Sequence, residues 1–492
     1  MNSIFARWTS ATILALQLAV IKGYAQPTVE WLTVAGTARQ DVPSDMALSS
    51  AGELLVTGNF DGRNGGFPET VLIKFDTKGK EISRQDTRGE LIRGVAVDAR
   101  GNYYLTGQVW DPNRFGIGVK NDFYLAKYSP SGALLWERAT GSGGTVGYHG
   151  GDGGSKIALD LEGNIYVAGT ATGAGVFGHV TFTGAGGPLL CKYDPDGTLL
   201  WVKRLADTGG GAWGIALDPS GKIVVAGYLK NSFFVAKHDA QGNQDWIRSE
   251  YGGDAVAVDS QGNIFVNGGE WGGNVMLCSK LAPTGESIWS RRVTGVYPLN
   301  VKLNSMGEPI FTGQFSGTVR LDDHLVQNKN RTIGDHYLIS KADANGRFQW
   351  ALGGNDDALV RVGPLVADAQ NNIYVAGSLR FIMTSTDCFC DKGSFGPFPL
   401  TMLFGGIDED MFIARLSEPP SLVPEIKVTR DGSNVKLSWS STVGTGYFLE
   451  SANVLPATSW TAVSETPSVA GGQNAVTVTT GSGSRFYRLR KP

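Results

Sequence analysis

Cysteine and histidine are scarce in this sequence of 492 residues, which has four cysteines and five histidines. So few cysteines exclude a small fold held together by disulfides. Cys191 and Cys278 lie within apolar segments, as small buried hydrophobic residues do. Cys388 and Cys390 are one residue apart in a long connecting segment, where a local disulfide, a metal or redox pair, and no role are all open. Two thiolates without a nearby histidine are too few ligands for a zinc site.

An excess of charge and long apolar runs are also missing. The net charge is −3, from 43 Lys and Arg against 46 Asp and Glu, which excludes a basic surface for nucleic acid. One apolar run, residues 11–21, is too short to span a membrane. It follows Arg7 and precedes the small residues Gly23 and Ala25, a pattern typical of a secretory signal peptide. We therefore expect cleavage of residues 1–25 after Ala25, and a protein that is secreted or held at the cell surface.

Motifs of catalytic chemistry are missing too. The sequence has no G-x-S-x-G elbow, no H-E-x-x-H motif and no phosphate-binding glycine loop. His149 and Asp152 stand three residues apart in a glycine-rich segment, which fits acid–base chemistry or a solvated loop. Further acidic residues in connecting segments are Asp41, Asp45, Asp254, Asp356 and Asp357. None has the spacing of a calcium-binding loop, so we expect these groups to be solvated and predict no catalytic residue, no metal and no cofactor.

What the sequence does contain is a repeated phrase of seven residues, in seven copies. The copies are GELLVTG (52–58), GNYYLTG (101–107), GNIYVAG (163–169), GKIVVAG (221–227), GNIFVNG (262–268), GEPIFTG (307–313) and NNIYVAG (371–377). A spacing of this length, built from short strands, is typical of a β-propeller with one repeat per blade.

Each repeat contains further strand signals around that phrase. Before it stands an apolar stretch that ends in Asp, Asn or Ser three residues before the turn glycine, where such a side chain can hydrogen-bond the turn. After it, six repeats carry a strand with Lys five residues before a Gly, and in five of them Trp follows that Gly by four. These tryptophans are Trp136, Trp201, Trp246, Trp289 and Trp350. Four strands per repeat, here A to D, follow from this order.

The last repeat lacks its fourth strand. Residues 410–416 form a strand C that runs into Pro-rich residues, whereas residues 29–34 at the start of the mature chain resemble the Trp strands. We therefore expect an all-β, seven-bladed propeller over residues 26–416, closed by the N-terminal strand 29–34; an open array is the alternative. A Pro-rich linker, 417–424, and a small β-sandwich, 425–492, follow it.

The two recurring phrases, D-x-x-G-N-x-Y-V-x-G and F-x-A-K-x-D-x-x-G-x-x-x-W, resemble the bacterial SBBP-type β-propeller repeat, as does GGNDD (353–357). This resemblance implies a secreted or surface-exposed propeller without a defined activity. The second phrase also resembles quinoprotein dehydrogenase repeats, but that family implies eight blades and adjacent cysteines, which this sequence lacks. LSW (437–439), YFLESA (447–452) and RFYRL (485–489) resemble fibronectin type III-like modules, which implies a spacer, adhesion or sorting role.

The long connections between strands B and C or D and A should emerge on one face of the propeller, where binding residues usually lie. Aromatic residues expected there are Trp213, Tyr148, Tyr251 and Tyr297 at the channel mouth, with Trp110 and Trp271 further out. Such rings either stack on sugars and peptide side chains or fill gaps between blades. We predict a monomeric, non-catalytic scaffold for binding or adhesion, with glycan or extracellular protein as partner. The alternative is an extracellular polysaccharide-active enzyme that uses the same face.

Overall fold

The computed structural model describes residues 6–8, 26–36, 41–60, 69–87, 91–109, 122–141, 152–173, 175–230, 232–270, 274–328, 336–354, 359–380, 393–400, 409–418, 426–431, 434–441, 447–454, 459–479 and 485–490. The chain divides into two compact units, Pro27–Ser417 and a second unit of Met1–Gln26 with Glu418–Pro492. The described residues form strands and turns and no helix, so none of them makes a helix that could cross a membrane.

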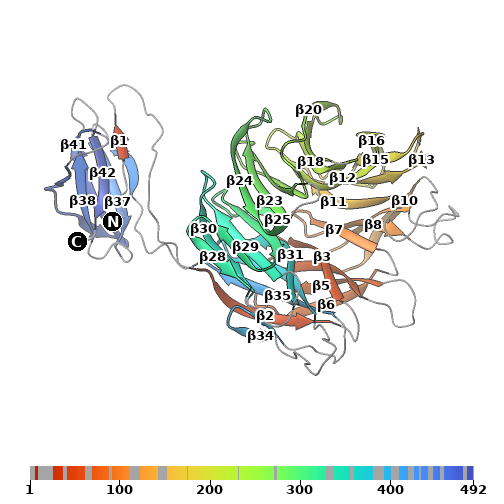
Figure 1. The fold of residues 1–492 in the computed structure, drawn as a ribbon, viewed down its shortest axis with the longest axis horizontal. Helices are drawn as coiled ribbons and strands as arrows, with labels where there is room; N and C mark the ends of the chain where they lie inside the picture. The colour runs from red at the N-terminus through yellow and green to blue at the C-terminus, as the bar shows by residue number, and fades with distance from the viewer. Residues whose placement is uncertain are drawn as a thin grey trace. The chain divides into compact units, whose positions relative to one another are not determined.

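The unit Pro27–Ser417 contains seven four-stranded antiparallel sheets in its described residues (Figure 1). Sheet 1 is β3 (Asp41–Leu48), β4 (Leu54–Phe60), β5 (Glu69–Phe75) and β6 (Glu81–Asp86). Sheet 2 is β7 (Leu91–Val97), β8 (Tyr103–Val109), β9 (Asp122–Tyr128) and β10 (Leu134–Thr140). Sheet 3 is β11 (Gly153–Leu159), β12 (Ile165–Thr172), β15 (Gly186–Tyr193) and β16 (Leu199–Arg204).

The other four sheets follow the same order from strand A to strand D. Sheet 4 is β17 (Gly210–Leu217), β18 (Ile223–Leu229), β19 (Ser232–His238) and β20 (Gln244–Arg248). Sheet 5 is β21 (Ala255–Val258), β22 (Ile264–Gly269), β23 (Val275–Leu281) and β24 (Ser287–Thr294). Sheet 6 is β25 (Val296–Leu303), β26 (Pro309–Phe315), β29 (His336–Ala342) and β30 (Phe348–Gly353). Sheet 7 is β31 (Leu359–Ala367), β32 (Ile373–Arg380), β35 (Glu409–Ser417) and β2 (Thr28–Ala35).

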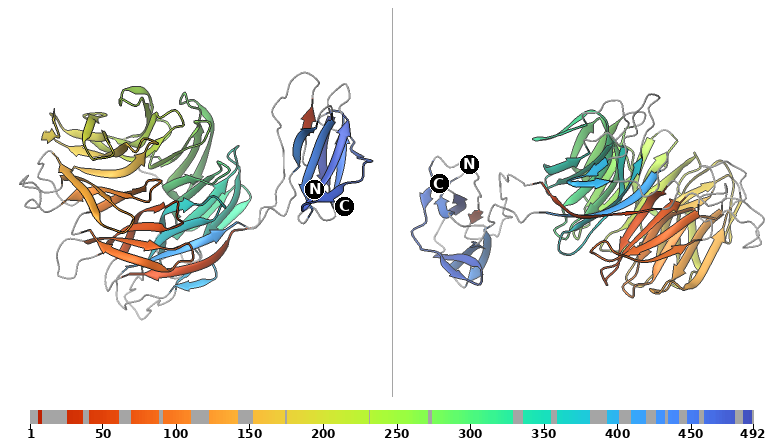
Figure 2. Two further views of the ribbon diagram at one scale, coloured as in Figure 1. Left: turned by 180° about the vertical axis from the view of Figure 1, so that it is seen from behind. Right: turned by 90° about the horizontal axis from the view of Figure 1, so that it is seen from below.

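The first strands of these sheets contact one another in a closed cycle, in the order β3, β7, β11, β17, β21, β25, β31 and back to β3. Figures 1 and 2 show the sheets arranged around the centre that these strands form. Buried hydrophobic clusters lie between neighbouring sheets; one of them joins Tyr166 and Leu190 of sheet 3 to Val225 of sheet 4. The arrangement is that of an all-β, propeller-type fold.

The last sheet takes its outer strand from the N-terminal end of the unit. In β2, Val29 pairs with Leu416 and Val34 pairs with Phe412 of β35. This confirms the prediction that residues 29–34 complete the last repeat. Val29 is buried in the cluster that also holds Leu416, so the pairing is supported by packing as well as by main-chain hydrogen bonds.

The A–B turns are held by the side chain that ends strand A. The carboxylate Oδ1 of Asp98 accepts hydrogen bonds from the N–H groups of Arg100 and Asn102, both at 2.9 Å. Gly101 between them has a φ of +80°, which glycine adopts without strain. Asp218, Asp259, Asn304 and Asp368 accept hydrogen bonds in the same way, as the spacing predicts.

Five of the six tryptophans on the outer strands are half-buried, and each lies on the C–D turn of the following sheet. A Cβ atom at Gly242 would lie 2.9 Å from ring atoms of Trp201, so glycine is required under the indole. The corresponding pairs are Trp31 with Gly79, Trp136 with Gly197, Trp246 with Gly285 and Trp289 with Gly346. Trp350 is different, because it is fully buried. The tryptophans thus link successive sheets.

In the described residues, three of the long B–C connections contain a two-stranded hairpin. The hairpins are β13 (Gly175–Phe177) with β14 (Val180–Phe182), β27 (Thr318–Leu321) with β28 (His324–Gln327), and β33 (Gly393–Phe395) with β34 (Phe398–Leu400). Phe177, Leu321 and Phe395 are buried in the clusters of their sheets. These stretches, which the sequence places among variable binding loops, therefore contribute to packing.

The second unit has two four-stranded sheets in its described residues. One is β36 (Lys427–Asp431), β37 (Asn434–Ser440), β41 (Gln473–Thr479) and β40 (Ser468–Ala470). The other is β1 (Ala6–Trp8), β42 (Arg485–Arg490), β38 (Phe448–Ala452) and β39 (Thr461–Ala462). Trp439 of the first sheet and Leu449 and Tyr487 of the second share one buried cluster. Of the predicted signal peptide, only Ala6–Trp8 lies within the described residues.

Candidate functional site

Each inner strand except β21 has an irregularity in its pairing near the middle of the strand, and in β17 it places Trp213 outside the regular pairing. Ala212 pairs with Gly227 and Gly214 pairs with Ala226, so Trp213 is the extra residue of a β-bulge. The single extra residues at the same position of other sheets are Ser44, Arg93, Ser155 and Leu299. Trp213 is 36% exposed, whereas its neighbours Ala212 and Gly214 are buried.

Aromatic neighbours hold the Trp213 ring. It stacks on Tyr228 with ring centroids 5.5 Å apart and an interplanar angle of 19°, and it meets Phe233 edge-on at 6.4 Å. A Cβ at Gly211 would lie 3.1 Å from the indole Nε1 and 2.5 Å from Thr170 Oγ1, so glycine gives the ring its room. The result is a preorganised flat surface with a polar N–H group, suited to stacking.

The other aromatic residues predicted for the loop-rich face of the propeller differ in their exposure. Tyr297, the second residue of β25, is 43% exposed. Tyr251 is half-buried and packs against the cluster of Val224 and Val256 between sheets 4 and 5. It therefore fills a gap between blades, the alternative that the sequence left open. Tyr148, Trp110 and Trp271 lie outside the described residues.

Charged side chains of three inner strands meet at the centre of the ring. Lys156 Nζ of β11 lies 2.6 Å from Asp45 Oδ1 of β3. Lys302 of β25 is close to both: burial lowers its pKa, the charge of Asp45 opposes that shift, and the charge of Lys156 adds to it. Our sequence reasoning missed this cluster, although a lysine within an otherwise apolar strand A was a usable signal.

We expected the acidic residues of the D–A connections to be solvated, but three of them are buried. Asp41, Asp45 and Asp152 are buried, because the inner strands pack side by side around the centre. Burial raises the pKa of Asp254 to about 7. Asp254 stands five residues before its turn Asp, which is the position that Trp213 has in sheet 4. Asp356, Asp357 and His149 lie outside the described residues.

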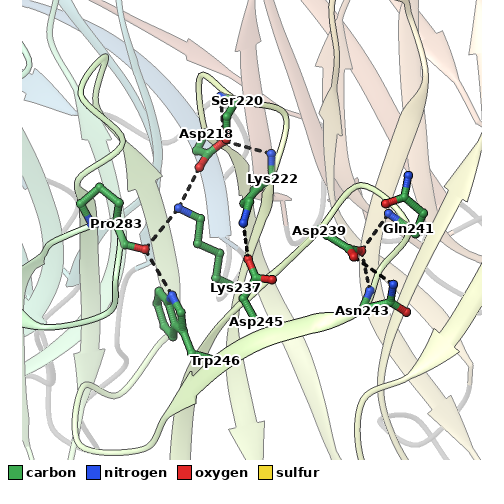
Figure 3. Close-up of polar contacts among 10 residues, drawn as sticks. All are labelled: Asp218, Ser220, Lys222, Lys237, Asp239, Gln241, Asn243, Asp245, Trp246 and Pro283. Atoms are coloured by element: carbon green, nitrogen blue, oxygen red, sulfur yellow. Dashed lines mark hydrogen bonds and ion pairs between the residues drawn. The ribbon is translucent and has the colours of Figure 1, made fainter.

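A recess lies between sheets 4 and 5 at the side of the short A–B and C–D turns, with a volume of about 550 Å³. Lys237 Nζ donates to Asp218 Oδ2 at 2.7 Å and to the Pro283 carbonyl at 3.3 Å (Figure 3). The Trp246 indole N–H donates to the same carbonyl at 3.2 Å. These polar groups line the recess and form hydrogen bonds with one another. They therefore stabilise the contact between the two sheets and are not available to a ligand.

The same arrangement recurs between sheets 2 and 3. There the Pro195 carbonyl accepts hydrogen bonds from Lys127 Nζ at 3.2 Å and from the Trp136 indole N–H at 3.3 Å. A feature repeated around the ring is a property of the repeat and not of one binding site. The Lys–Gly–Trp spacing in the sequence is thus explained by contacts between neighbouring sheets.

Within the described ranges, no three His, Cys, Asp or Glu side chains gather as a metal cluster. Cys191 and Cys278 are free and buried, and burial raises the pKa of both thiols, so neither is an activated nucleophile. Cys388 and Cys390 lie outside the described residues.

No protein-family model and no curated protein matches this sequence. Among solved structures, a gluconolactonase from Xanthomonas campestris is 12% identical, with a TM-score of 0.36 over 60% of this chain and 96% of that one. A luciferin-regenerating enzyme is 13% identical, with a TM-score of 0.38 over 65% and 97%. A puromycin hydrolase mutant is 13% identical, with a TM-score of 0.43 over 82% and 59%. Similarities this weak carry no argument about activity, and the resemblance to the SBBP-type repeat stays a prediction.

Proposed function

We propose that Pro27–Ser417 is a closed seven-bladed β-propeller of the SBBP type that serves, after export, as a non-catalytic scaffold for binding glycan or extracellular protein. The closed cycle of inner strands and the pairing of β2 with β35 support the ring. The second unit would be a fibronectin type III-like sandwich that acts as a spacer or adhesion module. The cluster shared by Trp439, Leu449 and Tyr487 supports that part.

The observation that carries the binding proposal is the Trp213 ring. The side chain of Trp213 is 36% exposed in the middle of an inner strand, and Tyr228 and Phe233 fix its orientation. A fixed, exposed indole loses little conformational entropy when a sugar ring or an apolar side chain stacks on it. Tyr297 provides a second exposed ring on another inner strand.

Trp213→Ala should weaken retention of the full chain on its ligand by about tenfold or more, the equivalent of about 1.4 kcal/mol. Binding would be measured on a glycan array and on insoluble polysaccharides, well below the melting temperature of the variant, which should fall by less than that of Trp350→Ala because the Trp213 ring is partly exposed. Trp246→Ala is the matched control: Trp246 lies at the short-turn recess, so its loss should leave retention intact. Undiminished retention by Trp213→Ala would refute the site.

Asp254 favours the polysaccharide-active enzyme as a second candidate. With a pKa of about 7, its carboxyl group is partly protonated at neutral pH, as a general acid must be. We rank this candidate lower because cleavage of glycosides normally needs two carboxyl groups, and only burial, with no nearby charge, shifts the pKa of Asp254. Release of reducing ends by the wild type, lost in Asp254→Asn, would reverse the ranking.

A further inference from the structure

Two buried carboxylates face each other where sheets 2 and 3 meet. Asp122 is the first residue of β9 and Asp152 directly precedes β11, and they are 1% and 2% exposed. Both approach Gly141, which follows β10. A Cβ atom at Gly141 would lie 2.3 Å from Asp122 Oδ1 and 2.9 Å from Asp152 Oδ2, so the two oxygens converge on one small space.

Hydrogen bonds do not compensate the charge of Asp122. Neither of its carboxylate oxygens accepts a hydrogen bond from a residue that the structure describes. Asp152 Oδ1 accepts hydrogen bonds from the Thr172 N–H and hydroxyl groups, and Oδ2 is the Asp152 oxygen nearest to Gly141. Moving a carboxylate out of water without a partner costs several kcal/mol, and a second carboxylate beside it adds to that cost.

A second junction among the described residues has the same geometry. Asp410 stands five residues before Arg415, as Asp122 stands five before Lys127. At that junction, between sheets 7 and 1, a Cβ at Gly36 would lie 2.6 Å from Asp41 Oδ2 and 2.8 Å from Asp410 Oδ1. Two separate junctions therefore bring a pair of aspartates together over a glycine.

Apolar side chains fill the equivalent positions elsewhere. Val275 stands five residues before Lys280, and Val296 stands eight before Asn304, as Asp152 stands eight before Asp160. Both valines are buried at the junction of sheets 5 and 6. Since the fold accepts valine at these positions, the aspartates are not needed for packing.

We propose that Asp122 and Asp152 bind a divalent cation of the calcium type at the junction of sheets 2 and 3. Calcium takes six to eight oxygen ligands, which carboxylates, main-chain carbonyls and water supply together in flexible geometry. The two negative charges of the aspartates match the charge of a divalent cation, which would compensate the buried pair. This revises the expectation, drawn from the sequence alone, that the chain binds no metal.

A proton shared between the two carboxyl groups is the competing way to neutralise the pair. Burial and the charge of Asp152 raise the pKa of Asp122 to about 6. A proton on Asp122 would neutralise one of the two carboxyl groups, whereas a divalent cation would compensate both. The two possibilities predict opposite responses to calcium and to acid.

Equilibrium dialysis of the full chain against calcium at slightly alkaline pH tests the proposal. The variant Asp122→Asn/Asp152→Asn should bind one Ca²⁺ fewer per chain than the wild type. A second variant, Asp122→Val/Asp152→Val, copies the Val275 and Val296 pair and should fold without calcium at this junction. Asp323→Asn changes an exposed carboxylate of the hairpin β27–β28 and should bind as the wild type does.

Thermal unfolding with excess EGTA or calcium gives an independent readout. The calcium-dependent rise in melting temperature should be larger for the wild type than for either double variant. Equal calcium stoichiometry in the wild type and the variants would overturn the proposal. It would also be overturned if the wild type bound no calcium at this pair and gained stability on acidification toward pH 6 in EGTA, since a shared proton would then neutralise the pair.

Discussion

Trp350→Ala should lower the free energy of unfolding by about 3–5 kcal/mol, the loss typical of a fully buried large aromatic side chain. Trp350 is 2% exposed and lies in the cluster between sheets 6 and 7, with Tyr337 and Val360. Removing the indole would leave a cavity that the surrounding strands cannot close without breaking their pairing. Denaturant titration of the full chain, followed by tryptophan fluorescence and circular dichroism, would measure the loss.

Trp201→Ala is the matched comparison, because Trp201 occupies the same position in its own repeat. Its ring is half-buried on the Gly242 turn, so we expect about half the loss of Trp350→Ala. Equal losses in the two variants would show that exposure does not decide the contribution of these rings. A loss below about 1 kcal/mol for Trp350→Ala would contradict its burial.

His238→Phe should remove a large part of the acid sensitivity of folding. His238 is 1% exposed, and neither ring nitrogen has a hydrogen-bond partner among the described residues. Burial lowers the pKa of His238 to about 4, whereas the unfolded chain has the ordinary value of about 6.5. Between these pH values His238 is protonated in the unfolded state and neutral in the native state. The wild type therefore loses stability as the pH falls from about 6.5 to about 4, by roughly 3 kcal/mol in total.

Phenylalanine is a suitable replacement, because Phe75, Tyr128 and Tyr193 occupy the same position in sheets 1 to 3. Above pH 7 the two proteins should differ little. Below pH 6.5 the variant should become progressively more stable than the wild type, and the difference should level off near pH 4. Other groups titrate in both proteins, so subtracting the two pH profiles of unfolding free energy isolates His238. A difference that does not change with pH would count against the shifted pKa.

The strands and turns of the ring could be predicted from the sequence because each repeat encodes them locally. Asp98 sits at a fixed spacing before Gly101, and that spacing alone specifies the hydrogen-bonded turn. The closing strand was predictable for a related reason: one repeat lacked a strand that the N-terminus carried.

Contacts between distant repeats could not be predicted from these local signals. Asp45, Lys156 and Lys302 come from three different repeats, and only the curvature of the whole ring brings their charges together. The burial of Asp152 likewise depends on how sheet 3 packs against sheet 2. Trp213 was identified from its glycine-rich surroundings, but its bulge and its stacking on Tyr228 required the tertiary structure.

The pairing of β2 with β35 also determines when folding can be completed. A ribosome makes the N-terminus first, and Val34 meets its partner Phe412 only after nearly the whole unit has been synthesised. At about 5–20 residues per second, that interval is on the order of tens of seconds. During it, Val29 and Trp31 belong to a strand without a neighbour, a state in which chains are prone to aggregate. The closure of the ring by β2 is therefore a late step in the folding of a newly made chain.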